Sequence, residues 1–379
     1  MTILNRLFLR KLTDKFFKFI NQLFIFKILG YHNDKPKRIL VIKLSAMGDA
    51  LCLMPSLRII KRKFPHSEVH WLTSYRSSPD LFKQVDFLDK IIVLPMGFRL
   101  IFSLFEIWRF KYDVCIDFDQ SYHFSETISN FANFNIGFKS QIKGSSFNLS
   151  LPYHSELNEK LLFLELTKIL LDEFQSDGIA FDYTVYEILN SFCPSSRLLN
   201  FASELSKYAT PVLIIYPGSS QNAIYRRWPI SKYIELANSF DSQVKVIFSG
   251  GVDEIPFKSS LLESGLANSD HINNWSLLEW AWIFKNVANL FVGNDAGLLH
   301  LAESQNLPVI GIFGPNIYSK WGSLNPLSIC VDKVLDCRPC IQGSLGLIPT
   351  SCSRGDVACL DISVSKVRSH VFEALFVLK

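Results

Sequence analysis

The sequence lacks the short motifs that mark several large classes of enzymes. It contains no GxxxxGK(S/T) run and no GxGxxG run, so neither a nucleotide triphosphatase nor a dinucleotide-dependent enzyme is favoured. It has no GxSxG elbow for a serine nucleophile. Low-complexity blocks and internal repeats are also missing from its 379 residues. A chain of this length, 48% hydrophobic and 20% charged, is expected to form two globular domains.

The chain has little net charge. Its formal value is +4, but residues 1–38 hold nine Lys/Arg and two Asp, or +7, which leaves −3 for the remainder. The basic character therefore belongs to the N-terminal end and not to the globular body. A groove for the backbone of a nucleic acid is not indicated, and no nucleic-acid partner is expected.

Long uncharged apolar runs are missing from the N-terminal arm, residues 1–37. Basic residues interrupt each apolar stretch, which excludes a transmembrane span, and no small-residue cleavage site follows, which argues against a signal peptide. At helical spacing, the apolar and basic residues fall on different faces. This pattern suits a helix lying in a membrane interface; an amphipathic helix packed on its own protein is the alternative. We therefore expect a cytoplasmic protein, peripheral on the inner face of the inner membrane.

From residue 38 onward, short β-branched runs alternate with segments of helical apolar spacing. The expected strands are residues 38–44, 68–73, 90–95, 112–118, 135–138 and 147–153, followed by 211–218, 244–251, 289–294 and 308–315. This alternation predicts an α/β fold with two doubly wound, Rossmann-like domains facing a central cleft. The expected domains are residues 38–205 and 206–379, preceded by the amphipathic arm.

The stretch KLSAMGDALCLMPSLR, residues 43–58, breaks an apolar strand and places one carboxylate, Asp49, at the start of a helix. Open α/β sheets carry their chemistry at the carboxyl edge, where this residue falls. Asp49 is either a helix cap or a catalytic group.

The stretch LFVGNDAGLLHLAESQNLPVIGIFGP, residues 290–315, ends a strand at Asp295 and opens a helix at Ala296, Gly297 and Leu298. Free backbone N–H groups at such a helix start suit a pyrophosphate. Asp295 is interpreted either as an acceptor for sugar hydroxyls or as a helix N-cap. His300 either faces a phosphate or is a core histidine.

The stretch YPGSSQNAIYRRWP, residues 216–229, places hydroxyls and cations just after another strand. Ser219, Ser220 and Arg226 are the groups that a diphosphate needs for hydrogen bonds and charge neutralisation. The alternative is a solvated arginine pair in a loop. A third strand ends at FSGGVDE, residues 248–254, where Asp253 or Glu254 could hold a ribose hydroxyl.

Five of the eight cysteines lie in a segment of residues 330–359. The spacing of Cys337, Cys340, Cys352 and Cys359 resembles a four-thiolate site for structural zinc or iron. Buried free thiols are the alternative, since a reducing cytoplasm disfavours disulfides.

Taken in order, the motifs from residue 38 to 370 resemble glycosyltransferase family 9, the lipopolysaccharide heptosyltransferases and their relatives. The resemblance rests on ILVIKLSAMGDALCLMPSLR, PGSS…RRWP, GNDAGLLHLA with PVIGIFGP, and a cysteine-bearing tail ending CLDISVSKV. It implies a GT-B fold and an inverting transfer that requires no metal cofactor, from a nucleotide diphosphate sugar, typically ADP-heptose. Asp49 matches the family's catalytic base. Asp295, Gly297 and His300 match its donor-binding motif, and Arg226 stands where the family usually has a lysine.

The resemblance therefore implies transfer of a sugar, most simply heptose, onto a lipopolysaccharide core or a related lipid-linked glycan. The partners implied are the donor, that acceptor and a membrane surface contacted by the N-terminal helix. The alternatives are a sugar-nucleotide epimerase or hydrolase on the same fold, and a catalytically silent homologue.

Overall fold

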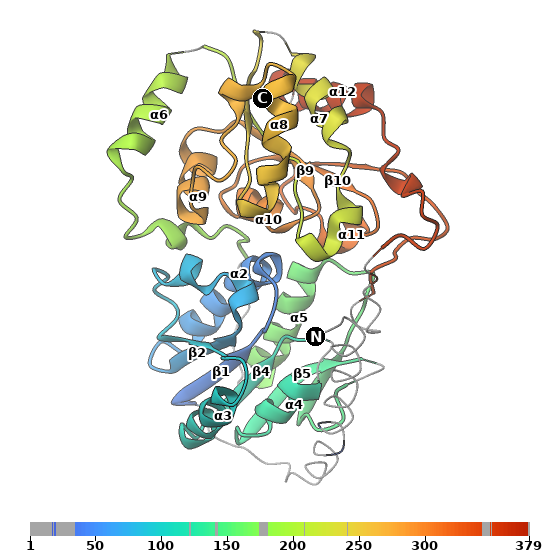
Figure 1. Cartoon of the computed structure of the whole chain (residues 1–379). Helices are drawn as coiled ribbons and strands as arrows, with labels where there is room; N and C mark the ends of the chain where they lie inside the picture. Colours follow the sequence, from blue (N-terminus) through green and yellow to red (C-terminus); the bar gives the residue numbers. More distant parts are fainter. Residues whose placement is uncertain are drawn as a thin grey trace. The chain divides into compact units, whose positions relative to one another are not determined.

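The computed structural model describes residues 17, 19, 35–120, 123–140, 143–173, 181–207, 209–240, 242–342, 349 and 351–377. The chain divides into two compact units (Figure 1): the first comprises the described residues up to Asp182 together with Gln342, and the second comprises the other described residues from Tyr183 onward. The predicted arm, residues 1–37, lies outside the described residues except for Phe17, Phe19 and residues 35–37.

The first unit contains a six-stranded sheet with strand order β3-β2-β1-β4-β5-β6, and all its pairings are parallel. Its strands are β1 (Arg38–Ile42), β2 (Glu68–Thr73), β3 (Lys90–Val93), β4 (Val114–Asp117), β5 (Phe134–Lys139) and β6 (Leu149–Pro152). Its helices are α2 (Met47–Lys63), α3 (Arg99–Arg109), α4 (His123–Ser129) and α5 (Glu159–Glu173), with 3-10 turns η1 (Tyr75–Ser77) and η2 (Pro79–Phe82). The observed strands fall close to the expected runs.

The central strands of this sheet are apolar on both faces. In β1, the four side chains of residues 39–42 are fully buried, as expected for a strand covered from both sides. Leu40 and Ile42 share one face, where they form a cluster with Ile107 of α3 and Ile128 of α4. Helices α2 and α5 pack against each other. The carboxyl edge of the sheet is thereby left as the place where polar loops gather.

The second unit contains a five-stranded parallel sheet with strand order β11-β10-β9-β7-β8. Its strands are β7 (Val212–Tyr216), β8 (Lys245–Phe248), β9 (Leu290–Asn294), β10 (Val309–Phe313) and β11 (Ile329–Asp332). Its helices are α6 (Ser196–Ser206), α7 (Ile230–Asn238), α8 (Lys258–Glu263), α9 (Leu277–Asn286), α10 (Gly297–Ser304), α11 (Tyr318–Trp321) and α12 (Val364–Phe376); the 3-10 turns are η3 (Tyr186–Leu189), η4 (Gln221–Arg226), η5 (Val252–Phe257), η6 (Ala267–Ser269) and η8 (Ala358–Leu360). Strand β11 was not expected from the sequence.

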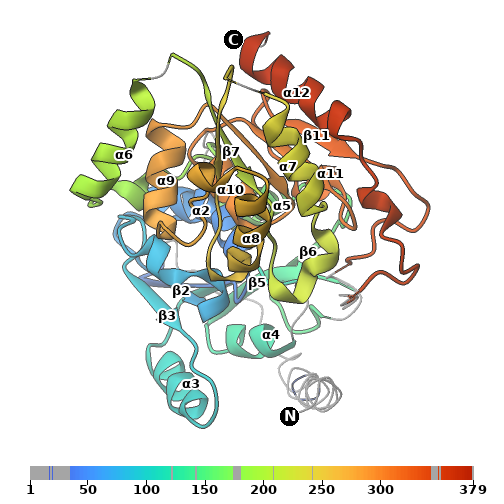
Figure 2. The same ribbon diagram turned by 45° about the horizontal axis from the view of Figure 1, so that its top comes forward.

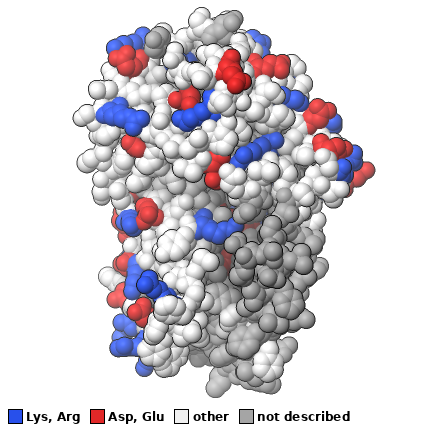
Figure 3. Space-filling view, in the orientation of Figure 1, with Lys and Arg blue, Asp and Glu red and all other residues white. Residues whose placement is uncertain are grey.

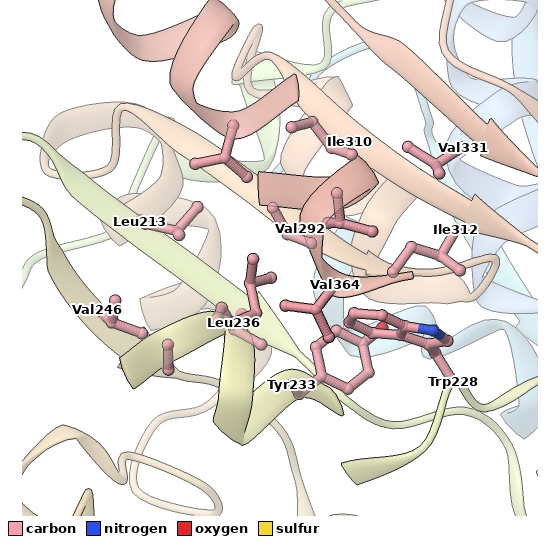
Figure 4. Close-up of a cluster of buried hydrophobic side chains, with 14 of the residues drawn as sticks. Leu213, Trp228, Tyr233, Leu236, Val246, Val292, Ile310, Ile312, Val331 and Val364 are labelled. Carbon is pink, nitrogen blue, oxygen red and sulfur yellow. The ribbon is translucent and has the colours of Figure 1, made fainter. Parts of the chain in front are cut away.

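The core of the second unit joins the sheet to helices from both ends of its sequence (Figure 4). Trp228 and Tyr233 pack edge to face with ring centroids 4.8 Å apart. The indole N–H of Trp228 donates to the carbonyl of Ile362 (3.1 Å), so this buried polar atom is satisfied. Val367 and Val371 of α12 are fully buried in the same cluster. Trp228 of the RRWP sequence is therefore a core residue of the second unit.

Residues 183–206 belong to the second unit, whereas the boundary expected from the sequence was residue 205. The N–H of Val185 donates to the carbonyl of Ser304 in α10 (2.8 Å). Phe201 of α6 packs against Trp275, with ring centroids 5.2 Å apart. These contacts attach a segment of polar composition to the domain that follows it.

Lysine and arginine side chains are interspersed with acidic ones on the face shown in Figure 3. Among the described residues visible there, no broad surface of one sign stands out. Within the described part of the chain, every helix is too short or too polar to cross a bilayer.

Candidate functional site

Asp49 lies at the topological switch point of the first sheet. Strand β1 has β2 on one side and β4 on the other, so the loops that leave β1 and β4 separate at this edge. Crevices at such points are where open α/β sheets bind their ligands. The β1 loop, residues 43–46, leads directly into helix α2. Asp49 in the first turn of α2 thus lies at the edge of its sheet where folds of this type bind their ligands.

The carboxylate of Asp49 is fixed by its own loop and remains partly accessible. Its Oδ2 accepts the N–H of Ala46 (3.1 Å), and its Oδ1 pairs with Nζ of Lys43 (3.0 Å). The side chain is 20% exposed. Asp49 therefore closes the start of α2, as the capping interpretation expects, and still presents a carboxylate oriented by Lys43.

Lys43 is almost completely buried and uses all three of its N–H donors. Besides Asp49, its ammonium contacts Oδ1 of Asp119 (3.3 Å) and Oε1 of Gln120 (2.9 Å). Burial alone would lower the pKa of Lys43, but the carboxylates of Asp49, Asp119 and Glu159 outweigh it and raise the pKa well above its usual value. Asp49 is therefore paired with an ammonium group that stays charged.

Further polar groups extend this arrangement into the first unit. Gln120 donates to Oε1 of Glu159 (2.8 Å), and the hydroxyl of Tyr153 donates to Oε2 of the same residue (2.8 Å). The N–H of Leu44 donates to Oδ2 of Asp119 (2.9 Å). The loop after β4 and the start of α5 therefore hold the loop after β1 in place.

A second buried network, centred on the ammonium of Lys143, also holds the loop after β4 in place. The Lys143 ammonium donates to Oδ2 of Asp117 (2.6 Å), to the carbonyl of Asp119 (2.6 Å) and to Oγ of Ser125 (2.8 Å). Burial raises the pKa of Asp117, and the adjacent Lys143 ammonium opposes that rise. Asp119 is therefore fixed through its main chain by Lys143 and through its side chain by Lys43.

The second sheet has its switch point between β7 and β9, and Asn294 joins the two strand ends there. Its Nδ2 donates to the carbonyls of Pro217 and Gly218 (3.0 Å each). Its Oδ1 accepts the N–H of Trp228 (2.9 Å) and the hydroxyl of Tyr233 (2.9 Å). This fully buried amide fixes the turn after β7 against β9, so it positions the loops on which the predicted donor residues lie.

Arg226 and Asp295, two of the predicted site residues, are brought together by the fold. The Arg226 guanidinium lies 3.6 Å from Oδ2 of Asp295, which also accepts a hydrogen bond from the amide of Asn316. Nε of Arg226 is buried and has no hydrogen-bond partner among the described residues. The N-cap of α10 is Ala296, so Asp295 is not the helix cap. The guanidinium retains donors for an anion.

Ser219 is engaged with the neighbouring arginine. Its buried hydroxyl donates to the carbonyl of Ala223 (2.9 Å) and accepts Nε–H of Arg227 (3.1 Å), and Arg227 also donates to the carbonyl of Ser219 (2.7 Å). A Cβ added at Gly218 would lie 2.1 Å from Oε1 of Glu254. A side chain at this position would displace the buried Glu254 carboxylate, and the turn after β7 is fixed by Arg227.

The remaining predicted donor residues differ in accessibility. Ser220 and Asp253 are exposed, Gly297 and Ala296 are partly exposed, and Leu298 is buried. The side chain of Gln221 donates to the carbonyl of Asp253 (3.3 Å), which places the two strand-end loops side by side. His300 is buried, and its Nδ1 lies 3.9 Å from Oε2 of Glu303. Glu254 is buried, and burial raises its pKa.

The four predicted metal-binding cysteines line one small cavity together with Tyr225 and Pro315. All four are free thiols, and Cys340 Sγ contacts the carbonyl of Cys337 (3.2 Å). Backbone N–H groups lower the pKa of Cys352, whereas burial raises the pKa of Cys340 and of Cys359. Among the described residues, no three Cys, His, Asp or Glu side chains are arranged to hold a metal ion. The donor set suits zinc or iron, but the thiols do not converge.

Solved structures share this fold. The E. coli ADP-heptose lipopolysaccharide heptosyltransferase II matches with a TM-score of 0.66 and 16% identity, over 89% of this chain and 98% of that chain. The E. coli heptosyltransferase WaaC with ADP matches with a TM-score of 0.63 and 18% identity, over 89% and 99% of the two chains. The two parallel-sheet α/β units therefore belong to the GT-B fold class.

Sequence comparison identifies the family within that class. The family model "Glycosyltransferase family 9 (heptosyltransferase)" matches residues 102–345, and the chain belongs to that family. Lipopolysaccharide heptosyltransferase 1 of Campylobacter coli is 26% identical over 313 residues, which cover 79% of this chain and 89% of that protein. The protein is accordingly a glycosyltransferase, as the sequence motifs predicted.

The sequence pattern singled out neither Lys43 nor Asn294. Both are polar residues within or next to apolar strands, and their partners lie far along the chain. The sequence did carry a signal for each: Lys43 directly follows a buried strand, and Asn294 ends another. A polar group buried at such a position must find hydrogen-bond partners, which marks it as a residue that organises the loops around it.

Proposed function

We propose that this glycosyltransferase moves a heptose from ADP-heptose onto a lipopolysaccharide core or a related lipid-linked glycan, with inversion at the anomeric carbon. The observation that carries the proposal is the state of Asp49. It is a partly exposed carboxylate at the switch point of its sheet, and Lys43 and the N–H of Ala46 orient it. The names of the relatives supply the donor and the acceptor class.

An inverting transfer needs one base. As the acceptor hydroxyl attacks the anomeric carbon from the face opposite the leaving group, Asp49 takes its proton. The C–O bond to the acceptor forms while the bond to the nucleotide diphosphate breaks, so ADP leaves with the electron pair. Lys43 does not exchange a proton in this scheme, because its three contacts keep it charged. Its part is to position Asp49.

The leaving diphosphate is assigned to the second unit. Arg226 supplies charge and guanidinium donors, Ser220 supplies an exposed hydroxyl, and the first turn of α10 at Ala296, Gly297 and Leu298 supplies the positive end of a helix dipole. Ser219 acts indirectly, because its hydroxyl and its carbonyl oxygen hold the side chain of Arg227 in place. These groups stabilise the charge that develops on the leaving oxygen.

The sugar and ribose hydroxyls are assigned to the carboxylates. Among the described residues, both side-chain contacts of Asp295 are made by Oδ2, which leaves Oδ1 to accept a sugar hydroxyl. Exposed Asp253 can accept a ribose hydroxyl, and His300 shapes the site from within α10. No cofactor is assigned to the chemical step.

Substitution of the base tests the proposal. Asp49→Asn keeps the shape of the side chain but removes the proton acceptor, so we expect turnover to fall by roughly a thousandfold while ADP binding stays unchanged. Transfer is followed with ADP-heptose and a lipopolysaccharide core acceptor, and anomeric configuration by NMR. A panel of ADP-, GDP-, UDP- and CMP-sugars in thermal-shift assays tests the donor. Full turnover by Asp49→Asn, or stabilisation by another nucleotide class alone, contradicts the proposal.

For Cys337, Cys340, Cys352 and Cys359, we propose a closed structural site for zinc or iron. Their common cavity supports it, and loading requires the thiols to move together and lose their protons. Elemental analysis of the purified protein is the test. Metal below about one-tenth equivalent rules the site out, as judged against the tight binding of structural zinc.

The arm, residues 1–37, is proposed to contact the membrane as an interfacial helix on the cytoplasmic side. Its basic and apolar composition supports this placement. A lipid-linked acceptor would then be met at the surface in which it is anchored.

A further inference from the structure

Helix α3 exposes a row of large apolar side chains on the first unit. Among the described residues, six exposed large hydrophobic side chains fall in this short stretch, which we call the α3 surface: Met96, Phe98, Ile101, Phe102, Phe105 and Trp108, each 54–89% exposed. In Figure 2 the helix stands out from its sheet. Contiguous apolar surface of this kind marks an interaction site.

The exposed row is distinct from the side of α3 that folds the unit. Leu100, Leu104 and Ile107 face the core cluster that includes strands β1, β2 and β4. Ile101, Phe105 and Trp108 recur at helical spacing on the other side, where the rings of Phe105 and Trp108 lie 5.7 Å apart. The helix is therefore apolar on two faces. Folding uses only one of them.

Charged residues around the α3 surface favour an anionic partner. Residues 99–111 contain Arg99, Arg109 and Lys111 against one acid, Glu106, a local charge of +2. The two arginines stand at the first and last positions of the helix. Aromatic side chains on one face with basic residues at the margins are typical of helices that lie in a bilayer interface.

We propose that the α3 surface docks the first unit on an anionic lipid bilayer, with its aromatic side chains among the acyl-chain boundary and its basic residues against the headgroups. A protruding convex helix suits a planar bilayer, whereas a small ligand needs a concave site. The residues of this contact are other than those of the arm, residues 1–37. Lipid binding is measured without turnover, so it does not depend on the proposed transfer reaction.

The test uses the full chain and vesicles of phosphatidylcholine alone or mixed equally with phosphatidylglycerol. The variant Phe102→Ser/Phe105→Ser/Trp108→Ser removes three exposed rings that folding does not use, and we expect roughly tenfold or greater loss of sedimentation with mixed vesicles. A control, Leu262→Ser/Val334→Ser/Val377→Ser, removes three apolar side chains of the second unit that are at least as exposed, and it should bind as the parent does. Arg99→Gln/Arg109→Gln should lose the preference for phosphatidylglycerol.

Two further measurements check the variants and the contact, and the oligomeric state and thermal stability of the α3 variant identify any other occupant of the surface. Thermal shifts with ADP should be the same for the parent and both triple variants, because the donor residues are untouched. On mixed vesicles the parent should show a blue shift of tryptophan fluorescence, and Trp108→Phe should reduce that shift. Unchanged vesicle binding by the α3 variant overturns the proposal. Combined with a change of oligomeric state, that result assigns the surface to a second copy; combined with lower thermal stability, it assigns the surface to the arm.

Discussion

At the scale of single residues, Lys43 carries more of the site than its position in the sequence suggests. One buried ammonium serves Asp49, Asp119 and Gln120, so the orientation of the proposed base depends on residues of another loop. Burying such a charge is costly unless every donor is paired, and here all three are. Removing the ammonium leaves carboxylates without their counterion.

We therefore expect Lys43→Met to lower the free energy of unfolding by about 3–5 kcal/mol, the usual effect of breaking a buried pair. The surface variant Lys168→Met, which loses only an exposed pair with Glu165, should change it by less than about 1 kcal/mol. Urea denaturation of both variants measures the difference. Equal stabilities would mean that the Lys43 network contributes nothing.

Arg226 is the residue on which the proposed diphosphate site depends. Arg226→Ala should weaken ADP binding by roughly tenfold or more, and Arg226→Lys should recover part of the affinity, since it restores charge without the planar guanidinium. Isothermal titration with ADP measures both. Arg197→Ala is the control, because that exposed arginine packs over the ring of Trp275. An ADP affinity that Arg226→Ala leaves unchanged would remove this residue from the site.

At the scale of elements, a buried carboxylate ties the loop of residues 143–147 to helix α4. Burial would raise the pKa of Glu126, but the His123 imidazole 3.5 Å away and hydrogen bonds from the N–H groups of Gly144 and Ser146 outweigh it and lower the pKa to about 2. A carboxylate whose pKa is lowered by folding stabilises the fold only while it is ionised.

The pKa of Glu126 falls from 4.5 in the unfolded chain to about 2 in the folded one, so its contribution is complete above pH 4.5 and is lost as the pH falls toward 2. The shift corresponds to roughly 3 kcal/mol. Urea denaturation between pH 7 and pH 3 should show the loss. Glu126→Gln should be less stable at pH 7 and should lose less stability on acidification; parallel curves would contradict this role.

The elements were largely predictable because the strands of both sheets are apolar runs of β-branched residues, which need no knowledge of distant partners. Strand β11 and helix α6 were not anticipated because they are short or polar and gain their stability from packing. The candidate site residues Asp49, Arg226 and Asp295 stood out because each follows an apolar strand within about ten residues. The pairing of Arg226 with Asp295 could not be predicted, because it depends on two loops far apart in the sequence.

At the scale of the whole molecule, the proposed donor site depends on the second unit only. ADP should therefore slow amide hydrogen exchange in the loops after β7 and β9 and leave β1, β4 and their loops unchanged. Hydrogen exchange followed by mass spectrometry measures this, with adenosine as a ligand that lacks the diphosphate. Protection confined to the first unit would show that the donor site has been assigned to the wrong half of the chain.

The place of α12 has a consequence for synthesis on the ribosome. The first sheet and the helices that cover it have all been synthesised once the chain reaches residue 173. This part of the chain can therefore pack while later residues are still being added. The core of the second unit cannot be completed until Val367, Val371 and Leu375 of α12 have been synthesised. These three residues pack in that core but come near the end of the chain, long after its strands. Until those residues emerge, strand β7 and its neighbours carry an uncovered apolar face, so this half of the nascent chain is the one that needs protection from aggregation.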